Sequence, residues 1–381
     1  MNASAPEGLY IHIPFCRQAC RYCDFYFTVS LHKADRFVHA VRREMARRRE
    51  EEPGAGKPTL RSLYLGGGTP SVLSDENLKS IRDEGFLRYD MAPDLEFTLE
   101  ANPDDLSPDR LSFFRSLGIN RLSIGIQSFL ESDLTFMRRS HSAKQARQSV
   151  EDAARAGFQN ISIDLIYGLP GQSAAGWERN LREALSLPVQ HISAYHLSFE
   201  EGTVFDHWRK KGRIAPVEDE DSLRFYGMLR EQLAKAGFEH YEISNFARSG
   251  YPSRHNQLYW SGRPYQAVGP SAHAFDGRRR SWNVSSLEAY LEGVEQGKPV
   301  REQEDLTVEE RYHDRLITTL RTSRGIDVAD IHADFGPAWR DHFLSESARF
   351  LEEGMLKEDG GTIRMAPEHW LETDRVLRGL F

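Results

Sequence analysis

The chain has 381 residues, a formal net charge of −8 at pH 7, and a composition that is 39% hydrophobic and 28% charged. This length predicts two domains, or one large barrel with an appendage, and the apolar content suffices for a large core. No apolar stretch approaches the roughly 18 residues that a membrane helix needs. The negative charge argues against nucleic-acid binding, which requires a basic face.

The N-terminal segment, MNASAPEG, is short and has no apolar core. We therefore expect no signal peptide there, and the segment also lacks the basic amphipathic character of a mitochondrial presequence. A reducing cytoplasm is the expected compartment.

Short apolar runs recur along the first 200 residues, and helical spacing follows each of them. The runs are Leu9–Ile13, Leu60–Leu65, Leu95–Leu99, Arg121–Ile126, Ile161–Ile166 and His191–Leu197. Strand–helix units in series predict an α/β fold in which helices cover a parallel sheet. Six such units favour an open, partial (β/α)6 barrel over residues 1–200. A free edge of this barrel would pair with a second subunit in a homodimer, or be covered by the C-terminal region.

The composition changes after residue 200. Residues 201–300 are expected to form an α+β extension that contains a helix at Leu223–Ala236. Residues 301–381 are expected to form a C-terminal domain, because Phe350–Pro367 has the pattern of a helix, a glycine turn and two short strands. This pattern predicts a small winged-helix-like tail, and the net charge favours packing over DNA binding for it.

The arginine-rich segment Val41–Glu50 is predicted to be a helix with a solvated face on the outside of the barrel. Docking of this face to an acidic partner or to an anionic membrane surface is the alternative, and it would make the protein peripherally membrane-associated.

The only three cysteines, Cys16, Cys20 and Cys23, lie within eight positions directly after the first predicted strand. Three thiolates are too many for one disulfide and do not match the paired grouping of a structural zinc site. Iron–sulfur clusters are held by cysteine thiolates, and three would leave one iron of a four-iron cluster without a protein ligand. Free thiols, or zinc bound with His12 as a fourth ligand, are the alternatives.

Further polar residues follow the next predicted strands, at the end of an α/β barrel where active sites lie. The second strand is followed by GGGTP, whose glycines let backbone groups approach a ligand closely. The third to fifth strands contribute Glu100, Gln127, Arg139 and Asp164. Each of these residues alone is compatible with a structural role, but their placement on successive strands predicts a ligand site.

The segment HNQLYW, His255–Trp260, concentrates aromatic and metal-ligating side chains. Histidine and tyrosine both ligate haem iron in proteins, and neighbouring aromatic residues would supply apolar surface for a porphyrin. Arg254 and Arg263 suit its propionates. From the residues alone, a buried His–Asn pair that braces a loop is the favoured alternative. His273 is a second candidate ligand.

Six motifs together carry a resemblance to a known family: YIHIPFCRQACRYCDF, GGGTP, LEANP, GIQSF, DLIYGLP and ISAYHL. They resemble the radical S-adenosylmethionine (SAM) family of oxygen-independent coproporphyrinogen oxidases and their haem-chaperone relatives. The resemblance implies a partial barrel, a [4Fe–4S] cluster held by Cys16, Cys20 and Cys23, and SAM on the open iron. It also implies a set of residues around SAM: Tyr10, Tyr22, Gly67, Gly68, Thr69, Glu100, Gln127, Arg139, Asp164 and Ser198.

Two departures from the oxidase branch point to radical SAM haem chaperones of the HemW type. The oxidases have a fourth cysteine two residues after the third, where this chain has Phe25, and they have a longer N-terminal extension. The HNQLYW segment is also similar to the H-N-x-x-Y-W motif of the chaperone branch. That resemblance implies haem contact by His255, Asn256 and Tyr259.

The leading hypothesis is a chaperone that holds haem, the cluster and SAM and delivers haem to respiratory or other haem-dependent proteins. The alternative is an oxygen-independent coproporphyrinogen III oxidase that uses a 5′-deoxyadenosyl radical. Radical modification of RNA or another macromolecule is a remote third class. Whether the chain is an enzyme stays open at this point, and no catalytic residue is assigned. Phe25 argues against coproporphyrinogen III dehydrogenase activity.

Overall fold

The computed structural model describes residues 5–51 and 56–381. Residues 1–4, which belong to the segment examined for a signal peptide, lie outside the described residues. Within the described part of the chain, no helix is both long and apolar enough to span a bilayer.

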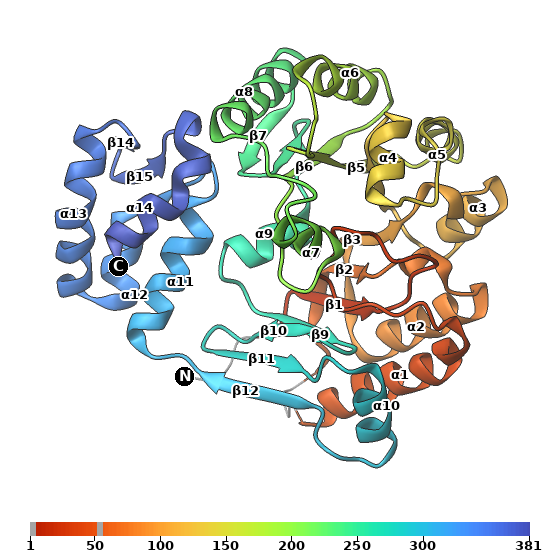
Figure 1. Cartoon of the computed structure of the whole chain (residues 1–381). Coiled ribbons are helices and arrows are strands. Elements are labelled where there is room, and N and C mark those ends of the chain that lie inside the picture. Colours follow the sequence, from red (N-terminus) through yellow and green to blue (C-terminus); the bar gives the residue numbers. More distant parts are fainter. Residues whose placement is uncertain (1–4, 52–55) are drawn as a thin grey trace.

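Six parallel strands form the centre of the molecule and pair in the order of the sequence (Figure 1). They are β1 (Gly8–Ile13), β2 (Thr59–Gly67), β3 (Asp90–Ala101), β4 (Arg121–Gln127), β5 (Asn160–Tyr167) and β6 (His191–His196). Because all six run in one direction, their carboxyl ends meet along one rim. The predicted α/β fold with a partial, six-stranded barrel is confirmed.

Helices cross from each of these strands to the next and cover the outer face of the sheet (Figure 1). They are α1 (Ala34–Glu51), α2 (Asp75–Arg88), α3 (Pro108–Ser116), α4 (Glu131–Met137), α5 (Ala143–Arg155) and α6 (Ala174–Leu185). Several begin at a serine that accepts a hydrogen bond from the first turn, and Ser142 forms a full capping box with Gln145 at α5. Short 3-10 turns precede α1, α2 and α3: η1 (Leu31–Lys33), η2 (Pro70–Val72) and η3 (Pro103–Asp105).

Alternation along the strands separates the apolar core from a polar barrel interior. In β1, Leu9, Ile11 and Ile13 are fully buried in the main apolar core, which also includes residues of α1. The residues between them, Tyr10 and His12, belong to the opposite face. The core therefore lies between sheet and helices, and the inner face of the sheet is left for polar side chains.

Strands from residues 201–305 extend both edges of the six-stranded sheet. On one side β8 (Asn245–Ala247) pairs with β6, and β7 (Glu239–Glu242) pairs with β8. On the other side β9 (Tyr265–Val268) pairs with β1 in parallel, and β10 (His273–Phe275), β11 (Arg279–Asn283) and β12 (Arg301–Asp305) follow it. The edges of the six-stranded sheet are thus covered by strands of the same chain. The helices of this region are α7 (Val204–Lys210), α8 (Asp219–Lys235), α9 (Arg254–Trp260) and α10 (Leu287–Glu295).

The C-terminal domain has the predicted winged-helix-like pattern and stands beside the barrel (Figure 1). Its elements are α11 (Val308–Leu320), β13 (Ile326–Asp327), α12 (Val328–Phe335), α13 (Pro337–Glu352), β14 (Leu356–Asp359), β15 (Thr362–Met365), η4 (Pro367–Glu372) and α14 (Thr373–Leu380). The ring of Trp370 packs edge-on against the ring of His240 on β7, with centroids 4.1 Å apart. A backbone bond from Ile243 N to Arg321 O, 3.0 Å long, adds a polar contact.

The expectation of a solvated arginine face on residues 41–50 needs correction. Arg48 is only 4% exposed, and its Nη2 donates to Glu44 Oε1 (2.6 Å) and to Asn283 Oδ1 (2.9 Å). Glu44 also accepts from Tyr290 Oη at 2.6 Å and from Gly269 N at 2.9 Å. The reason is that α10 and the β9–β11 region pack over this part of α1. Of the arginines, Arg43 and Arg47 remain exposed.

Arg48→Ala should strongly destabilise the fold, because it leaves the Glu44 carboxylate buried without its cation. We expect the free energy of unfolding to fall by about 3–5 kcal/mol, measured by denaturant titration. The matched control is Arg43→Ala, which removes an exposed arginine of the same helix and should cost about 0.5 kcal/mol or less. Equal losses in the two variants would contradict this account of the buried pair.

Candidate functional site: the carboxyl rim and interior of the barrel

The cysteine loop, residues 14–28, leaves the carboxyl end of β1 and returns beside it. Cys16 N donates to Thr28 O (2.9 Å), and Thr28 N donates to Pro14 O (2.6 Å). Further along, Arg21 N donates to Met137 O of α4 (3.2 Å) and Arg21 O accepts from Phe205 N of α7 (3.1 Å). These anchors hold three free, half-buried thiols at the rim of the barrel.

Two of the three thiols accept hydrogen bonds from neighbouring rim residues. Thr69 Oγ1 donates to Cys16 Sγ (3.5 Å), and Arg139 Nη1 donates to Cys20 Sγ (3.2 Å). Such donors stabilise the thiolate, which is the metal-ligating form. Burial alone acts the other way, since it raises the pKa of Cys16 and raises that of Cys23 to about 12. A coordinating metal deprotonates a thiol outright, so the donor set fits a metal–sulfur centre.

The zinc alternative with His12 does not fit the geometry. His12 Nε2 is bonded to Tyr26 O and its Nδ1 to Tyr10 Oη, both at 3.1 Å, and the ring is buried. Among residues 5–51 and 56–381, no three His, Cys, Asp or Glu side chains converge closely enough to hold a single metal ion. A four-iron cluster distributes its ligands over several irons, so its thiolates do not need to converge on one point.

The glycine segment packs directly against the start of the cysteine loop. Gly68 N donates to Ile13 O (2.9 Å) and Thr69 N donates to Phe15 O (2.7 Å). A side chain at Gly68 would place its Cβ 2.8 Å from Phe15 O, and Gly67 has a φ of +110°. Only glycine meets both requirements without strain, so the GGGTP motif is what allows the two loops to lie together.

Glu100, at the end of β3, is half-buried inside the barrel mouth. Its carboxylate accepts from Gly67 N (3.0 Å) and from Tyr64 Oη (2.7 Å). Burial raises the pKa of Glu100 to about 7, and the bond from Tyr64 opposes this rise only in part. A carboxyl group poised near neutrality in a cavity is a candidate for binding a cationic group.

Asp164 and Gln127 lie on the two neighbouring strands. Burial raises the pKa of Asp164 to about 6, and Ser123 Oγ donates to its Oδ1 at 3.4 Å. Gln127 ends β4 with a φ of +66°, a conformation that is rare for residues other than glycine. This backbone kink sits where the register of β4 against β5 shifts.

Arg139 connects the cysteine loop to the barrel. Besides Cys20, its guanidinium donates to Asn102 Oδ1 (2.5 Å), Gly125 O (2.8 Å) and Tyr22 Oη (3.4 Å). The side chain is half-buried and in direct contact with Cys20, so its positive charge acts at short range on the thiols. Tyr22 lies half-buried within a small apolar cluster that includes Leu134 and Met137.

Ser198 is the outlier among the residues that the resemblance places around SAM. It lies two residues beyond the end of β6 and is exposed. By contrast, Tyr10, Glu100 and Asp164 line one cavity of about 240 Å³ inside the barrel.

Sequence reasoning missed five residues of this cavity: Tyr64, Arg121, Ser123, Ser193 and Tyr195. Arg121 opens β4 and is 2% exposed, and its Nε has no hydrogen-bond partner among the described residues. The signal was present, since an arginine at the head of an apolar strand and a tyrosine in LRSLYL both break the apolar pattern. Their importance emerges only when neighbouring strands bring them together.

The HNQLYW segment forms the short helix α9 and not the loop considered above. Its backbone is anchored by Glu96 of β3, which accepts from Arg254 N and His255 N, both at 3.1 Å. Both ring nitrogens of His255 are engaged, Nδ1 with Ser62 Oγ and Nε2 with Tyr259 Oη, each at 2.8 Å. The ring stacks on Tyr64 with centroids 4.9 Å apart, and burial lowers the pKa of His255 to about 3. His255, Asn256 and Tyr259 all face the 240 Å³ cavity. The other candidate, His273, is exposed on β10 and stacks near Trp282.

Comparison with known proteins identifies the family of the chain. Residues 10–184 match the radical SAM superfamily, and residues 306–371 match the HemN C-terminal domain. The chain is 37% identical over 354 residues to heme chaperone HemW of Bacillus subtilis, which covers 92% of each chain. It belongs to the HemW family of radical SAM proteins. The HemW of Mycobacterium tuberculosis strain H37Rv is 33% identical and matches 98% of this chain and 95% of its own.

The fold of this HemW-family member is also that of a solved radical SAM enzyme. Coproporphyrinogen III oxidase from Escherichia coli superimposes with a TM-score of 0.84 over 99% of this chain and 90% of that chain. Its sequence identity is 23%, so the likeness concerns the fold. Membership of the radical SAM superfamily implies a [4Fe–4S] cluster and SAM.

Arg139→Gln should lower the reduction potential of a cluster reconstituted in this loop. Reduction adds negative charge, and a nearby half-buried cation stabilises the reduced state, so its removal favours the oxidised state. We expect a shift to more negative potential in a redox titration without SAM, at unchanged iron and sulfide content. Arg138→Gln alters the exposed neighbouring arginine and is the matched control. The same potential in both variants would refute a role for the Arg139 charge.

Glu100→Gln should remove a pH dependence of stability. The carboxyl ionises near 4.5 when unfolded and near 7 in the fold, so the folded state binds its proton more tightly. The wild-type free energy of unfolding therefore falls as the pH rises from 4.5 to 7, by about 3 kcal/mol from this group. Denaturant titrations between pH 4.5 and 8 without SAM measure it, with Glu76→Gln on exposed α2 surface as control. A constant difference between wild type and Glu100→Gln at all pH values would contradict the half-buried, neutral carboxyl.

Proposed function

We propose that this protein is a haem chaperone that holds a [4Fe–4S] cluster and SAM, binds haem and delivers it to haem-dependent proteins. The observation that carries the proposal is the likeness to HemW over nearly the whole length of both chains. Phe25, which stands where the oxidases have a fourth cysteine, also supports the proposal. Its side chain is 65% exposed two residues after Cys23, so this position supplies no fourth thiolate to the cysteine loop.

In this proposal Cys16, Cys20 and Cys23 hold the cluster. The surrounding rim then binds SAM through Tyr10, Tyr22, Gly67, Gly68, Thr69, Glu100, Gln127, Arg139, Asp164 and Ser198, as the resemblance implies. When bound, the cluster and SAM together supply one-electron chemistry that can generate a 5′-deoxyadenosyl radical.

The residues of the chain have distinct tasks in holding these groups. Arg139 donates to Cys20 and ties the cysteine loop to β4 through Gly125 O. Glu100 keeps a half-buried carboxyl beside the backbone of Gly67, where a cationic group of a ligand would favour its ionised form. Asp164, on β5 at the other side of β4, offers a second half-buried carboxyl group, which can accept hydrogen bonds from hydroxyl groups of a ligand.

For haem, the proposal places the contact at helix α9. His255, Asn256 and Tyr259 are the residues that the resemblance implies, and His255 would have to give up a hydrogen bond before it could ligate iron. The recipients are proteins that accept haem, and respiratory haem proteins are the expected class.

Anaerobic haem titration and transfer test this function. Cluster-replete protein should bind haemin saturably, and the loaded form should restore activity to an apo-haem protein, followed by optical spectroscopy and by the recipient's activity. Protein in which all three cysteines are replaced by Ala separates haem uptake from cluster-dependent delivery. The cluster-replete wild-type protein should convert no coproporphyrinogen III in the presence of SAM and a reductant. Absence of haem uptake would contradict the chaperone function. Production of protoporphyrinogen would support the oxidase instead.

A further inference from the structure

Helix α9 has two faces, and each of them lines a different cavity. His255, Asn256 and Tyr259 face the barrel cavity, which has a volume of about 240 Å³ and also contains Glu100 and Asp164. Arg254, Gln257, Leu258 and Ser261 follow helical spacing on the other side and line a second, larger cavity of about 630 Å³. Sites for ligands of haem size generally measure about 300–1,000 Å³, so size favours the outer cavity.

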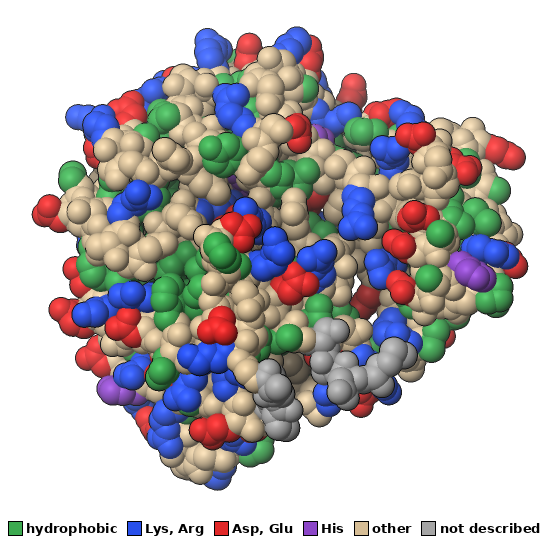
Figure 2. Space-filling model, turned by 180° about the vertical axis from the view of Figure 1, so that it is seen from behind, with side chains coloured by type: hydrophobic (Ala, Val, Ile, Leu, Met, Phe, Trp, Pro, Cys, Tyr) green, Lys and Arg blue, Asp and Glu red, His purple; other side chains and the backbone are tan. Residues whose placement is uncertain are grey.

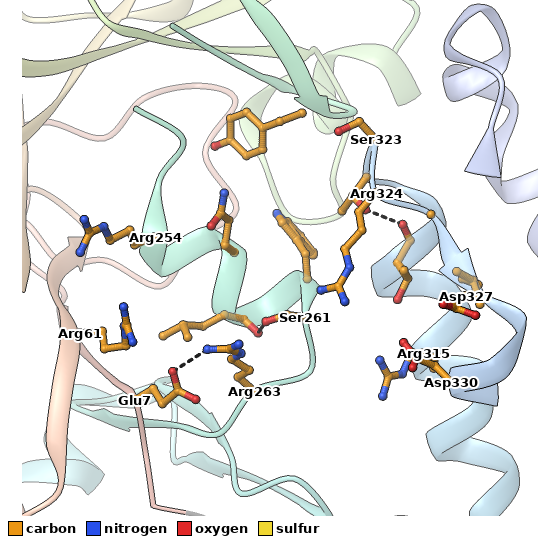
Figure 3. Close-up of a pocket in the computed structure, with 18 of the residues that line it drawn as sticks. Glu7, Arg61, Arg254, Ser261, Arg263, Arg315, Ser323, Arg324, Asp327 and Asp330 are labelled. Carbon is orange, nitrogen blue, oxygen red and sulfur yellow. Dashed lines mark hydrogen bonds and ion pairs between the residues drawn. The ribbon is translucent and has the colours of Figure 1, made fainter. Parts of the chain in front are cut away.

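This outer cavity is a cleft between the barrel and the C-terminal domain. Figure 2 shows the surface hollowed between these two parts, with basic side chains along the hollow. One wall comes from β2 and α9, and the other from α11, the turn before β13, and α12. Figure 3 shows Arg324 reaching from that turn toward Ser261, while Arg61, Arg254 and Arg263 lie across the cleft.

Only some guanidinium groups of the cleft have a carboxylate of their own. Arg263 pairs with Glu7 at 2.8 Å and Arg315 with Asp334 at 2.6 Å, and Asp327 and Asp330 also line the cleft. Arg61 and Arg254 share the single carboxylate of Asp94, at 3.8 and 2.7 Å. Arg324 is exposed, and its side chain makes no hydrogen bond or ion pair with any residue that the structure describes. Cations are thus available from both walls to bind carboxylates, for which guanidinium is the preferred bidentate partner.

An aromatic ring also lines the cleft. Trp260 lines the cleft, Arg321 stacks over its ring at 4.0 Å, and its buried Nε1 lacks a hydrogen-bond partner in the described part of the chain. A flat, largely apolar ligand with carboxylates at its edge matches this combination of an aromatic surface and opposed arginines.

We propose that the cleft on the outer face of α9 is the haem site, with the propionates held by Arg61 and Arg324 from opposite walls. This proposal rests on the proposed haem-chaperone function, and it places haem on the outer face of α9 in place of the inner-face contact by His255, Asn256 and Tyr259 that the resemblance implies. No histidine, cysteine or methionine is found among the described residues that line the cleft, and the hydroxyl of Tyr241, which does line it, is hydrogen-bonded to His191 Nε2 at 2.7 Å. Haem held there is bound mainly through its propionates and its ring, which leaves the iron available to a ligand from the recipient.

Haemin titrations of the full, cluster-replete chain test the site. Arg61→Gln/Arg324→Gln should raise the dissociation constant about tenfold or more, because charge-assisted bonds to both propionates are lost. Arg340→Gln/Arg375→Gln removes the same charge from α13 and α14, which contribute no residue to the lining of the cleft, and is the matched control. Haemin dimethyl ester, which lacks the carboxylates, should bind more weakly than haemin to wild type and equally to wild type and the cleft variant. Thermal unfolding of each variant verifies folding.

The outcomes separate this site from the function it rests on. Unchanged haemin affinity in the cleft variant would overturn the site while leaving the chaperone function in place. A loss in Asn256→Ala with none in the cleft variant would overturn it too and place haem on the inner face of α9. No saturable haemin binding by wild type would refute the chaperone function itself.

Discussion

The fold depends on a polar inner face within an otherwise apolar parallel sheet. Buried charges are costly unless they are paired or hydrogen-bonded. Inside this barrel, Arg121 is surrounded by the carboxylates of Glu96 and Asp164, and Glu100 is held by Tyr64 and a backbone amide. Two of these carboxyl groups have raised pKa values, which shows that the compensation is incomplete. A cationic or hydroxyl-rich ligand would offset the remaining desolvation of these carboxyl groups. The same groups therefore destabilise the empty barrel and enable it to bind such a ligand.

The same inner face determines where α9 lies. Glu96, on β3, receives the first two backbone amides of α9, and His255 fills the space between Ser62 and Tyr64. A helix anchored in this way closes one end of the barrel, while the cysteine loop occupies the other. Its outer residues are then available to the cleft beneath the C-terminal domain. One seven-residue segment therefore separates two cavities of different size and chemistry.

The sequence predicted the parts of this arrangement that follow from local pattern. The six apolar runs, the cysteine spacing and the glycine segment are each recognised from residues adjacent in the sequence. The runs form the six parallel strands, and the cysteine and glycine segments lie at the carboxyl ends of β1 and β2. Arg48 was misjudged, because its burial depends on Asn283 and on α10, which lie more than 200 residues away. Tyr64 and Arg121 were overlooked for the same reason. The sequence could not predict which residues of α9 face which cavity, because this depends on contacts of the helix with β2 and on the position of the C-terminal domain.

Separation of the two cavities has a consequence for haem handling by a radical SAM scaffold. The barrel cavity measures about 240 Å³ and is lined by Glu100 and Asp164 together with Arg121, so its size disfavours a large ligand. The cleft measures about 630 Å³ and has guanidinium groups on two walls, beside the carboxylates of Glu7, Asp94, Asp327 and Asp330. With haem in the cleft as proposed, SAM and haem would occupy separate cavities on opposite faces of α9. Because one cleft wall belongs to the C-terminal domain, haem bound there would be held between this domain and the barrel, away from the cysteine loop.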